Sequence, residues 1–135
     1  MLWVQRSIDK LKLGMIRSSW NILYFGRNFL NLQNKLYIMR IFTEKPLKLY
    51  ADSHPEAKTA LQDWIKKVKQ AQWHNLNDIR QTFNSVDYVG NQRYVFNIKG
   101  NDYRLVVVIQ FTPQFVYVRF IGTHSEYDRI DCSKI

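Results

Sequence analysis

Three segments typical of β-strands follow one another in the second half of the chain. The first, 93–98, alternates in polarity, and the third, 115–121, is rich in aromatic and β-branched residues. The middle segment, 103–111, is nearly all apolar after its first two residues, which predicts a central strand buried on both faces. Because only short turns at 100–102 and 112–114 separate the segments, we expect the strands to pair antiparallel as a meander. The rest of the chain has to supply whatever covers this sheet.

The segment before the strands carries helix signals between positions 46 and 69. Asp52-Ser53 can cap a helix, and Pro55-Glu56 suits its first turn. The apolar residues that follow recur at steps of three and four and define one face: Ala57, Ala60, Leu61, Trp64, Ile65 and Val68. A second short helix is expected near 76–83, and 86–91 is typical of an edge strand and a turn. Helices that precede an antiparallel meander predict a compact α+β domain.

Basic charge is concentrated at the start of the chain. The 135 residues carry 20 Lys and Arg against 11 Asp and Glu, and six of these basic residues but one acidic residue fall in positions 1–38. Apolar residues there follow no sustained period, whereas 39–42 is typical of a strand. We therefore expect a domain at 39–135 preceded by an extension, 1–38, that lies outside it. The extension is either a flexible or mis-assigned stretch, with Met39 as the true start, or a targeting segment.

The sequence disfavours several other classes of protein. The densest apolar run of the extension, 22–25, is far shorter than the roughly 20 residues of a membrane span, and no secretory signal is present. Cys132 is the single cysteine, so no intrachain disulfide can form, and no Cys/His cluster has zinc spacing. The five scattered glycines form no phosphate-binding loop. We expect a cytoplasmic protein with no membrane association, no metal and no cofactor.

The candidate functional residues lie on the meander or just beyond it. A strongly basic, aromatic-rich domain suggests an anionic partner, and nucleic acid first. Arg104 opens the middle strand. Arg119 lies inside the third strand between apolar neighbours, where a charge requires a buried salt bridge, an exposed sheet face or a functional surface. His124 and Tyr127 follow the third strand, and Lys99 lies at the first turn. The ends of neighbouring antiparallel strands meet, so these groups can share one face.

Such a set suits the cleavage of RNA. RNA can be cut without a metal ion when a 2′-hydroxyl attacks its own phosphorus. The enzyme must then remove the hydroxyl proton, protonate the leaving 5′-oxygen and stabilise the charge of the phosphorane. Arginine stabilises that charge, His and Tyr can transfer the protons, and Tyr can also stack on a base.

Three stretches of the chain together resemble the sequence motifs of a known protein family. They are Met39 to Thr43 with Leu47-Lys48, His54-Pro55 and Trp64; Arg93 to Leu105; and Tyr117 to Asp128. In this order and spacing, residues 39–135 resemble the HigB toxin family, the RelE-like mRNA interferases of bacterial type II toxin–antitoxin systems. The resemblance implies an α+β fold in which N-terminal helices pack on an antiparallel sheet. It also implies cleavage of mRNA on the ribosome, which stops translation. The implied partner is a HigA-like helix-turn-helix antitoxin, and operator DNA would be bound only by the toxin–antitoxin complex.

The resemblance also assigns roles to the candidate residues. Arg104 and Arg119 would bind and polarise the phosphate, and His124 and Tyr127 would supply acid–base or stacking roles. Contacts to RNA are expected from Lys99, Arg93 and Asn101. The general base stays open, because Glu126 or Asp128 can also supply a carboxylate. The alternative function is a non-catalytic basic module that binds RNA or the ribosome.

Overall fold

Three long strands form the centre of the protein, as the meander predicts. A computed structural model describes residues 38–135, and the expected extension, except for Ile38, lies outside these residues. The central strands are β3 (Arg93–Ile98), β4 (Tyr103–Gln110) and β5 (Phe115–Thr123). Two short strands, β2 (Val86–Tyr88) and β1 (Arg40–Ile41), extend the sheet to the order β1-β5-β4-β3-β2. The pairs are antiparallel except that β1 runs parallel to β5, so the first strand of the domain closes one edge of the meander.

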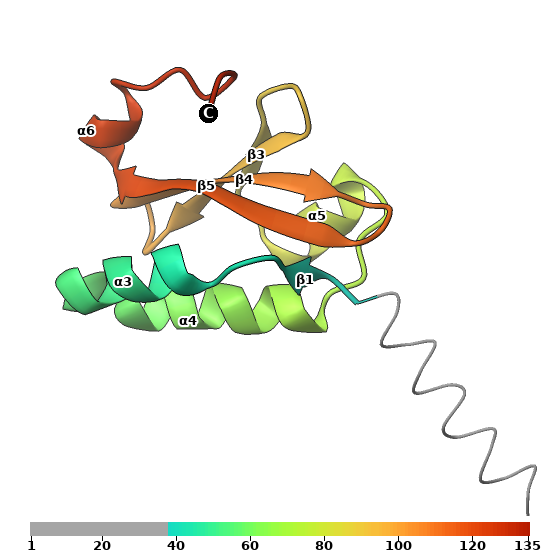
Figure 1. Cartoon of the computed structure of the whole chain (residues 1–135), viewed down its shortest axis with the longest axis horizontal. Helices are drawn as coiled ribbons and strands as arrows, with labels where there is room; N and C mark the ends of the chain where they lie inside the picture. Colours follow the sequence, from blue (N-terminus) through green and yellow to red (C-terminus); the bar gives the residue numbers. More distant parts are fainter. Residues whose placement is uncertain (1–37) are drawn as a thin grey trace, which may run out of the picture. The chain divides into compact units, whose positions relative to one another are not determined.

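The helices that precede the meander gather on one face of this sheet (Figure 1). They are α3 (Lys45–Ser53), α4 (Pro55–Gln70) and the short α5 (Leu76–Thr82). The predicted cap at Asp52-Ser53 is wrong, because these residues end α3 and His54 separates the two helices. Pro46 starts a helix of its own at the first turn of α3, and the Ser53 hydroxyl donates back to the carbonyl of Tyr50 at 3.0 Å. Among residues 38–135, no helix is long and apolar enough to cross a membrane.

The core lies between α4 and the sheet and is rich in aromatic side chains. Trp64 of α4 is 1% exposed and meets the ring of Phe96 on β3 edge-on, with centroids 5.5 Å apart. Trp73 and Phe83, from the segments that flank α5, pack against the same Phe96 ring. The Trp73 indole N–H donates to the hydroxyl of Thr82 at 2.9 Å, so its buried polar atom is satisfied. The amphipathic face predicted for α4 therefore holds the sheet in place.

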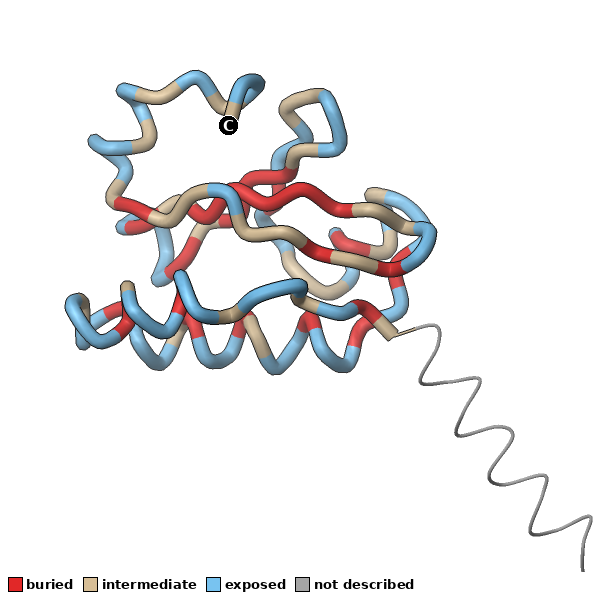
Figure 2. Tube along the Cα trace, viewed as in Figure 1, coloured by how far each residue is buried: buried red, intermediate tan, exposed pale blue. Residues whose placement is uncertain are grey.

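The middle strand is buried on both faces, as its apolar run predicts (Figure 2). Leu105, Val107 and Ile109 pack against the helices, whereas Val106 and Val108 lie on the opposite face. We call this second face, turned away from α3 and α4, the outer face. The chain after β5, beginning with α6 (His124–Tyr127), lies on that side of the sheet (Figure 1). The burial of Val106 indicates that both layers contribute to the core.

Candidate functional site

Strand β5 contains a β-bulge, and Arg119 is its extra residue. Val118 pairs with Val107 and Phe120 pairs with Val106, which leaves Arg119 without a partner in the ladder. Two residues thus oppose one, and Arg119 lies beside Phe120 on the outer face. Its side chain is exposed and makes no ion pair with any residue in 38–135. Of the readings that the sequence left open, the buried salt bridge is wrong within residues 38–135, and the exposed position fits both an exposed sheet face and a functional surface.

Arg104 is the second residue of β4, directly after the β3–β4 turn, and lies at one end of the sheet. One terminal nitrogen of its guanidinium donates to the carbonyls of Asn101 at 3.1 Å and Tyr103 at 3.4 Å. The turn itself needs a left-handed backbone at Lys99 (φ 52°) and Gly100 (φ 65°). The Lys99 ammonium lies 3.7 Å from the Asp102 carboxylate, and both are exposed. Arg104 is thus held by backbone carbonyls, while its other nitrogens have no hydrogen-bond partner within 38–135.

His124 begins α6, and a carboxylate orients its ring. Its backbone N–H donates to the Asp102 carbonyl at 3.2 Å, which joins α6 to the β3–β4 turn. Its Nδ1 lies 3.0 Å from Oδ2 of Asp128, one helical turn later. An ionised carboxylate only accepts hydrogen bonds, so Nδ1 carries the proton in this pair and Nε2 is left available. The i, i+4 spacing of His124 and Asp128 in the sequence is the signal that identifies this partner.

Glu126, the other carboxylate that the sequence left open, has a structural role. Its Oε2 accepts from the backbone N–H of Thr123 at 2.7 Å, and the Thr123 hydroxyl accepts from the Glu126 N–H at 3.3 Å. This reciprocal capping box starts the short α6. The hydrogen bonds from Thr123 hold the pKa of Glu126 below its usual range. Glu126 therefore fixes the position of its neighbours His124 and Tyr127.

Tyr127 is half-buried on the outer side of the sheet, close to Arg104. Burial above all, and then the neighbouring Cys132 thiol, raise the pKa of Tyr127 to about 12. The negative charge of Asp87 acts in the same direction, whereas the Arg104 guanidinium acts against it. The phenol is therefore protonated at physiological pH. It can donate a proton or a hydrogen bond and is poorly suited to act as a base.

The structure brings most of the predicted residues together at one end of the sheet. The turn with Lys99 and Asn101, the start of β4 with Arg104, and α6 meet there. Arg119 lies on the same face, since Val106, which it neighbours, is two residues and about 7 Å along β4 from Arg104.

Arg93 is the exception. It pairs with Val108 at the other end of β3, and its Nε donates to the carbonyl of Ile135 at 2.6 Å. A terminal nitrogen of the same guanidinium donates to the Asn91 carbonyl at 3.0 Å. Arg93 thus binds the chain that follows α6 and is not part of the group at the turn. Within 38–135 no three His, Cys, Asp or Glu side chains gather as metal ligands would.

Two supports of the site have no signal in the sequence. The Tyr103 hydroxyl donates to the Glu56 carboxylate at 2.5 Å, which ties the start of α4 to the start of β4 beside Arg104. This hydrogen bond raises the pKa of Tyr103 to about 12 and lowers that of Glu56. A Cβ at Gly122 would lie 2.5 Å from the Phe120 ring and 2.8 Å from the Glu126 carboxylate. Gly122 therefore allows Phe120 and Glu126 to close over the backbone next to Arg104.

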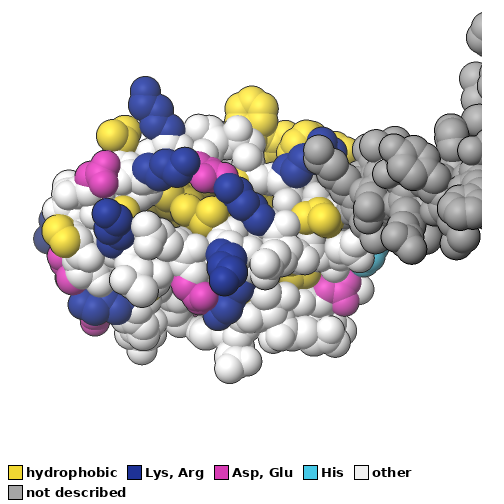
Figure 3. Space-filling view, turned by 90° about the horizontal axis from the view of Figure 1, so that it is seen from below, with side chains coloured by type: hydrophobic (Ala, Val, Ile, Leu, Met, Phe, Trp, Pro, Cys, Tyr) yellow, Lys and Arg dark blue, Asp and Glu magenta, His cyan; other side chains and the backbone are white. Residues whose placement is uncertain are grey.

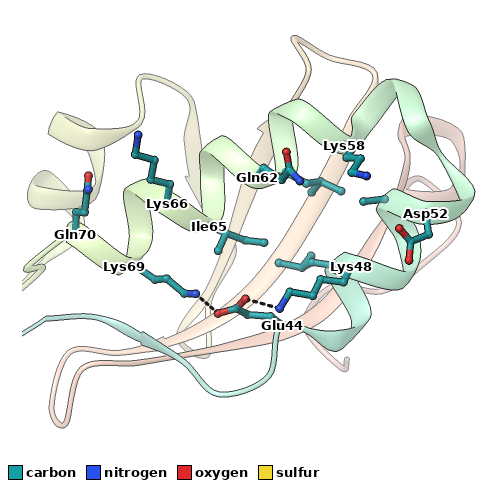
Figure 4. Close-up of a pocket in the computed structure, with 12 residues that line it drawn as sticks. Glu44, Lys48, Asp52, Lys58, Gln62, Ile65, Lys66, Lys69 and Gln70 are labelled. Carbon is teal, nitrogen blue, oxygen red and sulfur yellow. Dashed lines mark ion pairs between the residues drawn. The ribbon is translucent and has the colours of Figure 1, made fainter.

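A second basic surface lies on the helix side, away from these residues. A groove of about 610 Å³ runs between α3 and α4, with an apolar floor that includes Leu47 and Ile65. Lys and Arg side chains surround a hydrophobic hollow on this face (Figure 3). Glu44 at its edge pairs with Lys69 at 2.5 Å and Lys48 at 3.2 Å (Figure 4). This groove lacks the His, Tyr and Arg set of the candidate site.

Comparison with known proteins identifies the family. The model of the HigB_toxin family, described as the RelE-like toxic component of a toxin–antitoxin system, matches residues 57–130. The chain belongs to the HigB toxin family. It is 33% identical over 93 residues to the mRNA interferase toxin HigB of Escherichia coli (strain K12), covering 67% of this chain and 88% of that relative. The mRNA interferase HigB of Shigella flexneri matches to the same extent. That of Escherichia coli O6:H1 is 27% identical over 94 residues, or 68% of this chain and 91% of the relative. The α+β fold and the HigB resemblance predicted from the sequence are confirmed.

Proposed function

We propose that this toxin cuts mRNA on the ribosome through attack by the 2′-hydroxyl of the RNA, with no metal ion in the step. The toxin role and the endoribonuclease activity follow from the family and from relatives named mRNA interferases. The ribosome, the mechanism and the residue roles are the parts that we propose. The single observation that carries them is the meeting of Arg104, His124 and Tyr127 at one end of the sheet.

The two arginines are assigned to the scissile phosphate. Arg104 and Arg119 lie on the same face of neighbouring strands, and both have guanidinium nitrogens free within the described part of the chain. A guanidinium can bind two non-bridging oxygens at once, so the pair can hold the phosphate and stabilise the phosphorane. Lys99 and Asn101, on the adjoining turn, are assigned to contacts with the backbone of the RNA.

His124 and Tyr127 are assigned to the two proton transfers. Nε2 of His124 takes the 2′-hydroxyl proton, since Nδ1 is held by Asp128. The 2′-oxygen then bonds to phosphorus, the bond to the 5′-oxygen breaks, and Tyr127 gives its proton to that leaving oxygen. The raised pKa of Tyr127 keeps this proton in place until the step occurs. The products are a 2′,3′-cyclic phosphate and a 5′-hydroxyl.

Mapping the ends of a cleaved transcript tests this assignment. His124→Ala and Tyr127→Phe should each lower mRNA cleavage on ribosomes by about 100-fold or more, with ribosome association retained. Cleavage should continue in EDTA, under conditions that keep ribosomes assembled. A 5′-phosphate product would sink the mechanism. If the wild type binds ribosomes but cuts no mRNA, the non-catalytic binding module is favoured.

The partners follow the same family pattern. A toxin of this class acts with an antitoxin, and we propose a HigA-like helix-turn-helix protein whose complex with the toxin binds operator DNA in the cytoplasm. Co-expression with that antitoxin should restore growth and yield a co-purifying complex. Toxicity that persists in the presence of a stable complex would contradict this partner.

A further inference from the structure

We propose that the outer face of β1 and β5 is a stacking platform for the bases of single-stranded RNA. Its centre is an aromatic strip formed by Phe42, Phe115 and Tyr117. The inference rests on the proposed cleavage of RNA and extends it, because it assigns a second binding surface beyond the scissile phosphate.

The aromatic strip lies on the surface and not in the core. Phe42, directly after β1, is 68% exposed, whereas the core aromatics Trp64 and Phe96 are each 1% exposed. The Phe42 and Tyr117 rings have centroids 5.3 Å apart, and those of Phe115 and Tyr117 are 6.0 Å apart. Phe115 and Tyr117 pair with residues of β4 on the outer face, so the rings continue along one side of the sheet. Phe115 and Tyr117 are half-buried beside the exposed Phe42, and adjoining aromatic rings that lie partly or wholly on the surface of a small domain indicate a binding surface.

The charges on this surface are positive. The Arg40 guanidinium lies 4.9 Å from the centre of the Phe115 ring, and the exposed Arg119 follows Tyr117 on β5. Neither β1 nor β5 contains an acidic residue. Aromatic rings with interspersed arginines are the surface that single-stranded nucleic acids bind without strong sequence preference. A guanidinium that already lies on a ring also offers a flat surface to the next base.

The aromatic strip is continuous with the candidate site along β5. The strand leads from Phe115 and Tyr117 past the bulge at Arg119 to His124 at its end. Tyr117 and His124 are seven positions apart, about 20 Å along an extended strand. An RNA held at Arg119 can therefore place several flanking nucleotides on the aromatic strip.

Binding of a labelled single-stranded RNA to the full chain tests the platform independently of cleavage. The RNA carries 2′-deoxy substitutions, so it cannot be cut by 2′-hydroxyl attack, and fluorescence anisotropy reports its dissociation constant. Phe42→Ala and Tyr117→Ala should each weaken binding by about 5-fold or more, and Tyr117→Phe should bind like the wild type. Tyr88→Ala is the matched control, since this tyrosine is 52% exposed but lies on β2 at the opposite edge of the sheet.

The salt dependence separates stacking from charge. Phe42→Ala and Tyr117→Ala should leave the slope of log affinity against log salt unchanged, whereas Arg40→Ala should reduce it by about 0.7. The platform is refuted if the wild type does not bind the RNA, or if the aromatic variants bind as tightly as the wild type. It is also refuted if those variants lose the antitoxin instead of the RNA. Failure of wild-type cleavage on ribosomes, with the binding losses observed, would refute the proposed function and leave the platform standing.

Discussion

The two faces of the sheet are made by the same strands but serve different purposes. On the helix side, β4 presents Leu105, Val107 and Ile109 to the helices, and all three are at most 1% exposed. On the outer face the same strand presents Arg104 at its end, while β5 adds the exposed Arg119. Val106 and Val108 are buried on the outer face, and Arg119 lies beside Val106. Stability therefore depends chiefly on one face, and the proposed chemistry depends on the other.

The largest loss of stability should come from removing a core side chain on the helix side of the sheet. Trp64→Ala removes a ring that packs against Phe83 and Phe96, and should lower the free energy of unfolding by about 3–5 kcal/mol. That is a large part of the stability of a small domain. Urea denaturation followed by circular dichroism measures it, with Lys66→Ala, exposed on the same helix, as the control. A loss below about 1 kcal/mol would contradict a central role of Trp64 in the core.

A substitution on the outer face should lower cleavage activity and leave the free energy of unfolding nearly unchanged. Arg119→Ala should reduce mRNA cleavage by about 100-fold or more, because a stabiliser of the phosphorane is removed. The free energy of unfolding should change by less than about 0.5 kcal/mol, since the side chain is exposed. Arg119→Lys keeps the charge but loses the planar fork, so it should recover part of the activity. Arg80→Ala, an exposed arginine on the helical layer, is the matched control, and equal losses in the two alanine variants would contradict the comparison.

A substitution at Gly122 should affect stability and cleavage together, unlike the substitutions on a single face. Gly122→Ala forces the Phe120 ring and the Glu126 carboxylate to move, so both stability and cleavage should fall, the former by about 1–3 kcal/mol. Combining it with Phe120→Leu should restore part of the stability, because the ring that the new methyl meets is gone. Denaturation and cleavage assays on the single and double variants measure the coupling. Additive losses would show that the two side chains do not share this space.

A smaller effect should come from the ion pairs at the edge of the helical groove. The hydrogen bond from Lys69, and then the one from Lys48, hold the pKa of Glu44 below its usual value despite partial burial. A lowered pKa in the folded state means that the stabilisation is present above the unfolded pKa and is lost as pH falls through the folded one. Glu44→Gln should therefore cost up to about 1 kcal/mol at pH 7 and less at pH 3, where the carboxylate is more protonated. Thermal unfolding at both pH values tests this, and an equal loss at both would remove the electrostatic explanation.

Neither face should depend on residues 1–38. A chain that begins at Met39 should fold, arrest growth and be neutralised by antitoxin as the full chain is. Circular dichroism and a growth assay provide the comparison. Loss of folding or of toxicity would make residues 1–38 part of the working protein.

Local pattern was enough to predict most of the scaffold. The meander, the doubly buried middle strand, the amphipathic helix around Trp64 and the edge strand at Val86 all have signals within a few residues. What the sequence did not reveal depends on distant partners. The bulge exists only because β5 pairs with β4, and the parallel pairing of Arg40 with Phe115 joins segments far apart in the chain. Arg93 meets a carbonyl 42 positions away, which no spacing rule anticipates.

The positions of the candidate residues were predicted unevenly for the same reason. The turn and the end of β5 are adjacent in any meander, so the meeting of Arg104 with Tyr127 could be inferred. Which of Glu126 and Asp128 contacts the His124 ring could not be inferred, because it depends on which carboxylate the capping box uses. The hydrogen bond between Tyr103 and Glu56 connects two elements whose packing is decided by the core.

The role proposed for Arg119 means that cleavage activity and a regular β5–β4 ladder exclude each other at this position. Deleting Arg119 would bring Val118 and Phe120 into direct sequence, each already opposite its own partner on β4, and the ladder would become continuous. The shorter chain would lose cleavage activity through a change that makes the strand more regular. We expect this chain to stay folded, because the deletion removes an exposed residue that has no partner in the ladder. A lineage burdened by the toxin thus has a one-codon route to a harmless and well-folded descendant.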